Sequence, residues 1–342
     1  MAAPAAARCG VLAAGNWIAD TAKIIDAWPA QDTLCSILAE QTCNGGGAYN
    51  ILVDLAELGA PFPLEGAGCI GADAAGEAIR ADCRRRGIGT TALHTHPQAP
   101  TSYTDVMTVQ STGRRTFFHQ RGANRFFAPG DVDCPASTAR WFYLGYPLLL
   151  DAMDAEDPEF GTGCARLLAA ARASGHLTMA DLVSVDHPDY AGHVARLLPH
   201  TDVLVLNEIE AGRATGISLD GPPSRGGAWQ QAAEALLHGG VGRAVVIHHP
   251  QGALAAPRSG SSQVQPALRV PPEAIRGTVG AGDAFAAGLL CGLHEGMDLT
   301  TCLEQAACAA AACLTHPTTS GGLRPLADCR ALAAQWGWQP TA

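Results

Sequence analysis

The segment Gly277–Leu290 (GTVGAGDAFAAGLL) combines residue types that suit the transfer of a phosphoryl group. Three small residues at positions 280–282 precede Asp283, which opens an apolar helical pattern. Small residues let backbone amides crowd around an anion, and a helix start adds unpaired N–H groups and the positive end of the helix dipole. A carboxylate beside such an anion site is suited to accepting a proton from an attacking hydroxyl. The segment also fits a tight turn with Asp283 as a helix cap, so both interpretations stay open here.

A second glycine-rich stretch, Asn44–Gly59 (NGGGAYNILVDLAELG), leads into another helical pattern. Gly46 and Gly47 permit close approach of a polar ligand to the backbone, and Asn50 on the first turn both donates and accepts hydrogen bonds. Sugar hydroxyls need such two-way partners, although a plain turn before a helix has the same composition. The spacing lacks the Gly-x-Gly-x-x-Gly fingerprint, which argues against a dinucleotide-dependent oxidoreductase.

Two further candidate positions follow predicted strands. In LVLNEIEAGRATG (Leu204–Gly216), Asn207 and Glu210 are three residues apart on the first helical turn. They lie at the carboxyl end of a strand, where ligands bind in open α/β sheets. One Asn and one Glu suffice for a magnesium ion that keeps several waters, but the pair also fits a helix capping box. Asp20 comes soon after the first predicted strand, where it either holds two sugar hydroxyls or is a solvated loop residue.

The elements that must position these residues are short apolar runs alternating with Ala- and Leu-rich stretches. Continuous apolar runs are typical of parallel strands that are buried on both faces, and their alternation with helices predicts an α/β fold. The expected strands are Cys9–Ala14, Trp141–Tyr146, Asp202–Leu206 and Ala244–His248. The expected helices are Ala48–Leu58, Asp73–Arg86, Gly163–Ser174, Ala228–His238, Asp283–Glu295 and Leu299–Leu314. Residues 20–35 and 92–120 lack a helical period and predict a small strand-rich flap.

Charge and composition exclude several classes of protein. The chain has 342 residues and a net charge of -10, with Lys23 as its single lysine and no basic run, so nucleic acid is not expected as a partner. Without a Gly-Lys-Ser/Thr sequence, any nucleotide phosphates must be bound without a P-loop lysine. No apolar run approaches the roughly 20 residues that span a membrane, and the start has no charged region before its apolar stretch, so neither a membrane anchor nor a signal peptide is expected. Twelve scattered cysteines, without Cys-x-x-Cys pairs, predict reduced thiols and a cytoplasmic location.

The four segments, in this order, resemble the ribokinase-like (PfkB) carbohydrate kinase family from about Cys9 to about Leu323. The stretches that carry the resemblance are GGGAYN with the following LAELG, and TVGAGDAFAAG. The resemblance implies a three-layer α/β/α ribokinase-like fold with a mostly parallel central sheet and a small β-lid. It implies one kinase domain over residues 9–323, with lid segments at about 20–35 and 92–120. Residues 324–342 are then expected as a helix or tail packed on the same domain.

The resemblance also implies roles for the candidate residues, with ATP and Mg²⁺ as cofactors. Asp283 would be the catalytic base, and the amides of Gly280, Ala281 and Gly282 would form the anion hole. The sugar hydroxyls would be held by Asp20, Gly46, Gly47 and Asn50. The nucleotide would contact Asn207, Gly252, Thr278, Gly280 and Gly282, and Glu210 with Asn207 would organise Mg²⁺ through water.

Some positions depart from the family pattern. Gly277 stands where the family usually has Asp, which leaves a monovalent-cation site undecided. In VVIHHPQGAL, Ile247 and His249 replace the Thr and first Gly of the family's nucleotide loop, and Gly252 is kept. With so few basic residues, arginines of the flap are candidates for additional phosphate contacts, and these are Arg115 and Arg121.

The sequence therefore predicts an ATP-dependent kinase that transfers the γ-phosphoryl group to a primary hydroxyl of a small sugar. It does not specify which sugar. One alternative is a nucleoside kinase on the same fold, for which Trp17, Tyr103 and Phe118 are candidate walls for the base. The other is a non-catalytic sugar-binding or regulatory homologue. Exposed strands at the edge of the lid predict a homodimer through the lid.

Overall fold

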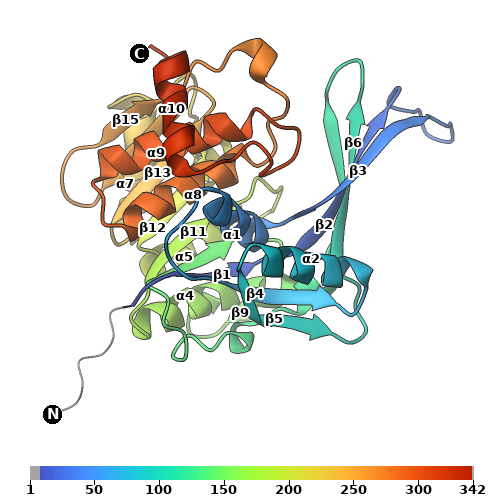
Figure 1. Ribbon diagram of the computed structural model, residues 1–342. Coiled ribbons are helices and arrows are strands. Elements are labelled where there is room, and N and C mark those ends of the chain that lie inside the picture. The colour runs from blue at the N-terminus through green and yellow to red at the C-terminus, as the bar shows by residue number, and fades with distance from the viewer. Residues whose placement is uncertain (1–7, 341–342) are drawn as a thin grey trace.

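A nine-stranded sheet forms the centre of the protein in a computed structural model that describes residues 8–340 (Figure 1). Its strands are β1 (Val11–Gly15), β4 (Leu64–Gly71), β5 (Gly89–His96), β8 (Trp141–Gly145), β11 (Leu177–Asp181), β12 (Val203–Asn207), β13 (Ala244–His249), β14 (Gly252–Pro257) and β15 (Gln263–Pro266). They lie in the order β15-β14-β13-β12-β11-β8-β1-β4-β5. Only the two pairings of β14 are antiparallel. The sheet is thus mostly parallel, as predicted.

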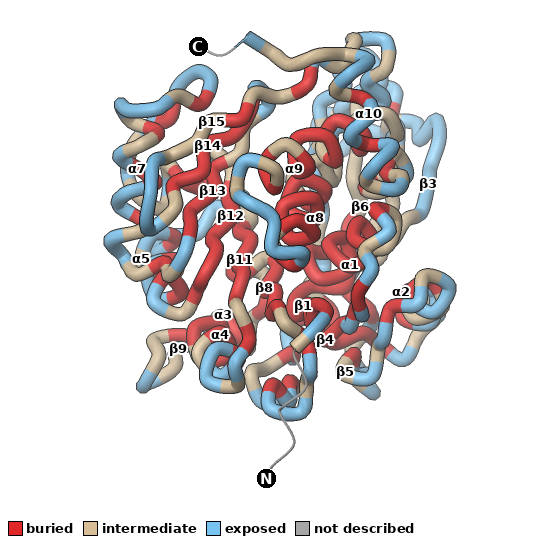
Figure 2. Tube along the Cα trace, turned by 60° about the vertical axis from the view of Figure 1, so that its left-hand side comes forward, coloured by how far each residue is buried: buried red, intermediate tan, exposed pale blue. Residues whose placement is uncertain are grey.

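Helices cover both faces of this sheet. One layer contains α1 (Gly47–Glu57), α2 (Ala74–Arg85), α8 (Ala281–His294), α9 (Leu299–Cys313) and α10 (Leu326–Trp336). The other contains α3 (Asp151–Asp154), α4 (Gly163–Ala173), α5 (Tyr190–Leu197), α6 (Glu208–Thr215) and α7 (Gly227–His238). Along β1, Val11 and Ala13 pack into the first layer, whereas Leu12 and Ala14 pack into the second. Figure 2 shows the central strands and α8 as buried. The predicted three-layer α/β/α fold is confirmed.

Short elements complete the described chain. They are the 3-10 helices η1 (Gly122–Phe126), η2 (Pro129–Asp131), η3 (Leu198–His200) and η4 (Pro272–Ala274), and the two-residue strands β9 (Glu156–Asp157) and β10 (Gly161–Thr162). α10 packs on α9, and its Leu332 lies in the core. Trp338 forms an isolated antiparallel β-bridge with Leu268. Residues 341–342 of the expected tail lie outside the described residues. None of the described helices is both long enough and apolar enough to cross a bilayer.

Four strands leave the central sheet and form a second sheet, which we call the lid. They are β2 (Ile18–Ile25), β3 (Ile37–Gly45), β6 (Ser102–Val109) and β7 (Arg115–Gln120), in the order β3-β2-β6-β7. Figure 1 shows the lid projecting from the body of the molecule.

The structure corrects the predicted lid segments, 20–35 and 92–120, at two places. Residues 92–96 belong to β5 of the central sheet. Because β5 is an edge strand with many exposed side chains, its sequence lacks the continuous apolar run of the inner strands. Residues 37–45 form β3, which is mostly exposed and whose sequence likewise lacks a continuous apolar run.

Trp17 marks the point where the chain passes from β1 into the lid. Its side chain is fully buried, and its Nε1 donates to the carbonyl of Ala67 at 2.9 Å. Asn124 of η1 pairs with both backbone groups of Trp17, accepting from its N–H and donating to its carbonyl at 3.1 Å each. Trp17 is therefore a core residue that anchors the base of the lid, and it is not available as a wall for a substrate.

Candidate active site

The start of α8 is shaped by glycine. Gly280 is the residue before the helix and has φ 82°, and a Cβ there would lie 2.3 Å from the carbonyl oxygen of Thr319. No side chain caps the helix, and the amides predicted as the anion hole, at Gly280, Ala281 and Gly282, have no hydrogen-bond partner in the described chain. This arrangement suits an anion, because free N–H groups and the helix dipole point the same way.

Asp283 lies on the first turn of α8 and is only 6% exposed. Tyr146 donates its hydroxyl to Asp283 Oδ1 at 2.6 Å, and Asn50 donates from Nδ2 to Asp283 Oδ2 at 3.0 Å. Burial raises the pKa of Asp283 to about 6, and these two hydrogen bonds oppose the rise. The carboxyl group therefore titrates near neutral pH, where a proton acceptor works best.

Tyr146 was not singled out from the sequence, because it reads as the last residue of an apolar strand. In the structure it follows β8 with φ 56°, a left-handed conformation that is uncommon for a large side chain. Its N–H donates to the carbonyl of Asp181 at 3.0 Å. This backbone turn directs the Tyr146 hydroxyl at Asp283, and the local sequence does not predict the turn.

The glycines before α1 are required by packing. Gly46 has φ 101°, and a Cβ there would lie 2.4 Å from the carbonyl oxygen of Asn16. A Cβ on Gly47 would lie 3.0 Å from the Cα of Gly145. These contacts bring the start of α1 against β1 and β8, so that Asn50 reaches Asp283. Asn50 Oδ1 is buried without a hydrogen-bond partner in the described chain, so it remains free to accept from a ligand.

Asp20 lies on the lid strand β2, beside Asn50. A Cβ on Gly45 would meet Asp20 Oδ2 at 2.1 Å and Asn50 Oδ1 at 4.0 Å, which places both side chains around this glycine. Burial raises the pKa of Asp20 to about 6, and a hydrogen bond with Thr104 opposes the rise.

Asp20 belongs to a polar row that crosses the lid. The strand register pairs Asp20 with Cys43 and Thr104, and pairs Thr104 with His119, so the four residues share one face. Thr104 Oγ1 lies 3.1 Å from His119 Nδ1. Thr104 and His119 were missed in the sequence; only the alternation within TSYTDVMTVQ and RRTFFHQ could have indicated them.

A cavity of about 440 Å³ opens on the other side of the α8 start. It is lined mainly by apolar residues, which suits a purine ring. The lining includes Asn207, Gly252, Thr278 and Gly282 among the residues predicted for the nucleotide, together with Ala281, which was predicted for the anion hole. Gly280 and Glu210 are not in the lining, but each is adjacent in the chain to a lining residue, Ala281 and Ile209 respectively.

The altered loop after β13 has a structural explanation. Ile247 is fully buried in the core, and His249 Nδ1 accepts from the N–H of Gln251 at 3.1 Å within the turn. His248 lies beside Gly282, since a Cβ there would meet its Cε1 at 3.3 Å. Burial and the neighbouring His249 lower the pKa of His248 to about 4, so this imidazole is neutral at physiological pH and brings no positive charge to a phosphate.

Asn207 and Glu210 form the capping box that the sequence left as an alternative. Asn207 Oδ1 accepts from the Glu210 N–H, and Glu210 Oε2 accepts from the Asn207 N–H, both at 2.9 Å. Glu210 Oε1 accepts from Ser184 Oγ and from Asn207 Nδ2 at 2.8 Å each. The Glu210 carboxylate thus accepts three hydrogen bonds, which leaves about one of its four acceptor sites free.

The remaining sequence candidates lie elsewhere. Arg121 pairs with Asp151 at the base of the lid, and Arg115 lies further along β7. The register places Tyr103 and Phe118 on the lid face opposite to the polar row, and Phe118 stacks on Trp28. At Gly277 a Cβ would lie 2.9 Å from the carbonyl oxygen of His316, so this position has no room for a side chain.

Known proteins are similar to this chain over most of its length. The family description "pfkB family carbohydrate kinase" matches residues 20–324. A nucleoside kinase of Methanothermobacter thermautotrophicus is 25% identical over 339 residues, which cover 96% of this chain and 97% of that protein. A fructokinase of Klebsiella pneumoniae is 29% identical over 265 residues, 73% of this chain and 77% of that protein. The structure of Arabidopsis thaliana ribokinase complexed with ribose and ATP superposes with a TM-score of 0.77 at 22% identity, over 95% of this chain and 98% of that one, and so has the same fold.

Asp54 provides a test of the electrostatics around the site. It is fully buried on α1, and neither carboxylate oxygen has a well-aligned hydrogen-bond partner in the described chain, although the nearby Ser320 hydroxyl favours the charged form. Burial and the charge of Asp283 raise the pKa of Asp54 well above its ordinary 3.8. Between the two pKa values, Asp54 therefore keeps its proton in the folded chain but has released it in the unfolded chain. As the pH rises above about 3.8, this difference lowers the free energy of unfolding.

Asp54→Asn removes this titration. We expect the free energy of unfolding of the variant, relative to the original chain, to increase between about pH 5 and about pH 8, as measured by urea denaturation. The exposed Asp328 on the first turn of α10 supplies the control, since Asp328→Asn should show no comparable increase. A pH-independent difference for Asp54→Asn would contradict the assignment of a buried protonated carboxyl.

Proposed function

Since the chain belongs to the pfkB family of carbohydrate kinases, we propose that it transfers the γ-phosphoryl group of ATP to a primary hydroxyl of a small sugar. The observation that carries the proposal is the position of Asp283. Its carboxylate lies at the free N-terminus of α8, between the apolar cavity and the polar row of the lid. At this place the carboxylate has the substrate hydroxyl on one side and the anion site on the other.

In the proposed reaction Asp283 accepts the proton of the acceptor hydroxyl while that oxygen bonds to the γ-phosphorus and the bond to the leaving ADP oxygen breaks. The amides of Gly280, Ala281 and Gly282 stabilise the negative charge of the transferring group. Asn50 holds Asp283 in place and has a free Oδ1 for the acceptor. Asp20 and Thr104 bind further hydroxyls from the lid, which also excludes water from the reaction.

Mg²⁺ is the cofactor that the donor set of the site fits. Burial, together with the charges of Asp283 and Glu210, raises the pKa of Asp181 well above its usual range. A divalent cation relieves such a concentration of carboxylates, and Mg²⁺ prefers oxygen ligands and retains waters. Asn207 and Glu210 would hold the ion through water, with the phosphates supplying other ligands. When bound, Mg²⁺ neutralises charge on the phosphates of ATP.

A nucleoside is the second candidate acceptor. Phe117 lies two residues from His119 on β7, hence on the same face as the polar row, and it is 58% exposed. Its ring could stack on a base, a role that Trp17, Tyr103 and Phe118 cannot fill from their positions. The alignment with the nucleoside kinase relative covers 97% of that protein, and this similarity also supports a nucleoside as acceptor.

The activity test compares acceptors in an assay of ADP formation. With ribose, fructose, deoxyribose, hexose acids and nucleosides as a panel, we expect one class to be turned over. Asp283→Ala should lower kcat by about 10²- to 10⁴-fold while sugar and ATP affinities stay near those of the original chain. Asp328→Ala, on the first turn of α10, is the matched control and should keep full activity.

Two results would argue against this function. Near-normal turnover by Asp283→Ala would exclude its role as base. Binding of a sugar without turnover of any acceptor would favour the non-catalytic homologue. Phe117→Ser separates the two acceptor classes, because it should raise KM for a nucleoside and leave KM for a simple sugar unchanged.

The pH dependence of kcat/KM tests the environment of Asp283. Only the deprotonated carboxylate accepts a proton, so kcat/KM should fall as the pH drops through about 6. The Tyr146 hydroxyl favours the charged carboxylate, and Tyr146→Phe should therefore move this fall to higher pH, with a larger loss of rate at about pH 6 than at about pH 8. An unchanged profile in Tyr146→Phe would show that another group, such as Asp20, controls the fall.

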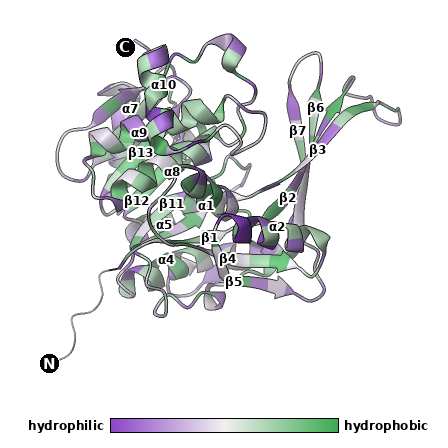
Figure 3. Cartoon of the chain, in the orientation of Figure 1, coloured by the Kyte–Doolittle hydropathy of each residue, from purple (hydrophilic) through white to green (hydrophobic). Residues whose placement is uncertain are grey.

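We also propose a cytoplasmic location, where ATP is available, and a homodimer through the lid. Figure 3 shows hydrophobic segments on the lid strands, and Ile37 of the outer strand β3 is 53% exposed. Light scattering should give twice the 35.2 kDa chain mass, and Ile37→Asp should reduce the mass to that of one chain. A single-chain mass for the unmodified protein at micromolar concentration would contradict the dimer.

A further inference from the structure

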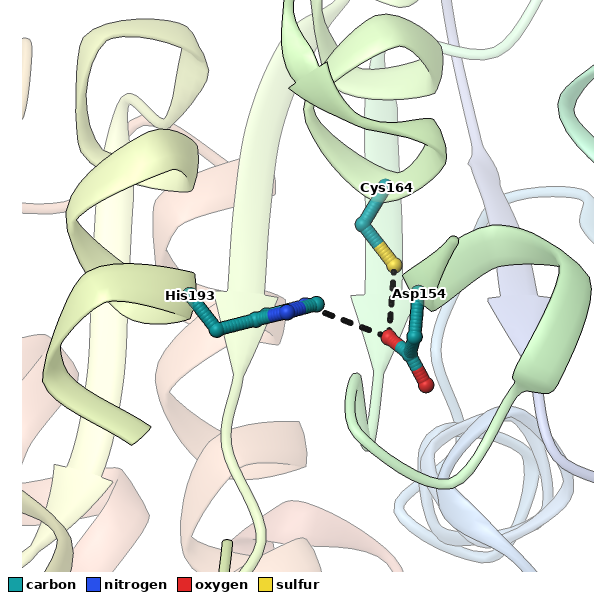
Figure 4. Close-up of side chains that lie close together, drawn as sticks. All are labelled: Asp154, Cys164 and His193. Carbon is teal, nitrogen blue, oxygen red and sulfur yellow. Dashed lines mark hydrogen bonds and ion pairs between the residues drawn. The ribbon is translucent and has the colours of Figure 1, made fainter. Parts of the chain in front are cut away.

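Asp154, Cys164 and His193 form a compact cluster outside the proposed kinase site (Figure 4). Asp154 is the last residue of α3, Cys164 is on the first turn of α4, and His193 is on α5. Figure 4 shows the His193 ring and the Cys164 sulfur directed at the same carboxylate oxygen. The three residues are separated by ten and 29 positions in the chain, so no local spacing motif connects them.

Two separations between the side-chain atoms match those of ligands around one metal ion. Cys164 Sγ lies 3.4 Å from Asp154 Oδ1, and His193 Nε2 lies 3.2 Å from the same oxygen. All three atoms lie within 4.8 Å of one another. For tetrahedral zinc, with Zn–S of about 2.3 Å and Zn–N and Zn–O of about 2.0 Å, the expected separations are about 3.5 Å for S···O and about 3.3 Å for N···O.

His193 supplies an independent reason to expect a ligand. Its side chain is 5% exposed, and its Nε2 has no aligned hydrogen-bond partner in the described chain, although it is directed at Asp154. A buried imidazole nitrogen without a partner is costly, and a metal ion bonded to its lone pair would remove that cost.

Asp154 is held in the orientation of a metal ligand. Its Oδ1 accepts from the N–H of Leu148 at 2.8 Å, and its Oδ2 accepts from the N–H of Leu150 at 2.7 Å. Ligating carboxylates usually have such supporting hydrogen bonds, which fix the direction of the remaining lone pairs.

We propose that Asp154, Cys164 and His193 bind one Zn²⁺ ion, with a water molecule as the fourth ligand. A thiolate, an imidazole and a carboxylate are a ligand set for zinc rather than for magnesium or calcium. On binding, the S–H bond of Cys164 breaks, its proton goes to solvent and a Zn–S bond forms, without oxidation or reduction. Without a cation, burial and the charge of Asp154 raise the pKa of this thiol well above its usual range, which favours the protonated form.

The ion would stabilise the segment that carries Tyr146. Tyr146 and Leu148 both have positive φ, of 56° and 75°, and Asp154 fixes the backbone of this turn through Leu148 and Leu150. Arg121 at the base of the lid donates to the carbonyl of Leu148 at 3.4 Å. Zinc bound to Asp154 would therefore support both the lid base and the strained turn.

The test measures zinc binding directly on the full chain. After treatment with a chelator, the protein is titrated with Zn²⁺ in competition with a chromophoric chelator, and we expect one tight site per chain and an increase in Tm. Substitution by Co²⁺ should give the charge-transfer absorption of a cobalt–thiolate bond and the visible bands of tetrahedral cobalt. A stoichiometry well below one, or a cobalt spectrum without the thiolate band, would overturn the proposal.

Variants assign the ligands. Loss of a supporting group alone weakens a metal site by about 10- to 100-fold, so Cys164→Ala and His193→Gln should each weaken Zn²⁺ binding by at least about 100-fold. Cys83→Ala is the control, because Cys83 is equally buried on a helix but lies outside the cluster, and its Zn²⁺ affinity should be unchanged. Equal loss in Cys83→Ala and Cys164→Ala would also reject the site. If Cys164→Ala does not fold, the cobalt spectrum of the unmodified chain still decides.

Discussion

The buried carboxylate of Asp283 is the constraint on which the rest of the site depends. A carboxylate removed from water is stable only if it is hydrogen-bonded, and here the donors come from two distant parts of the chain. Asn50 lies on α1 and Tyr146 follows β8, so α1, β8 and α8 must meet within hydrogen-bonding distance. The close contacts of Gly47 with Gly145 and of Gly280 with Thr319 make this meeting possible, since any side chain there would separate the elements.

The fold brings three different surfaces to this carboxylate. The parallel strands of the central sheet end at one edge, where the helices α1, α6 and α8 begin. The apolar cavity lies on one side of the α8 start, and the polar row of the lid approaches from the other. Ligands commonly bind at the carboxyl ends of strands in open α/β sheets because loops and helix starts gather there. The lid adds the polar side chains of Asp20 and Thr104, to which the proposed function assigns further acceptor hydroxyls.

Charge is managed with few basic side chains. The chain carries a net charge of -10, and the imidazole of His248 beside the α8 start is kept neutral by burial. In the proposed reaction, free amides at the start of α8 would therefore stabilise phosphate charge, and a divalent cation near the buried carboxylates would assist them. The cluster of Asp154, Cys164 and His193 likewise has no basic side chain with a permanent charge. There a bound cation would balance the charges of a carboxylate and a thiolate in the protein interior.

The sequence by itself determined the α/β class, most of the inner strands and helices, and the positions of Asp283, Asn50 and Asn207, because apolar period and helix-start composition are local patterns. Tertiary structure alone decided the positions of Tyr146 beside Asp283 and of His119 beside Thr104, the sheet to which β5 belongs and the burial of Trp17. It also brought Cys164 to Asp154 and His193. These features depend on contacts between residues far apart in the chain, on a backbone turn with positive φ and on strand register, none of which leaves a mark in a short stretch of sequence.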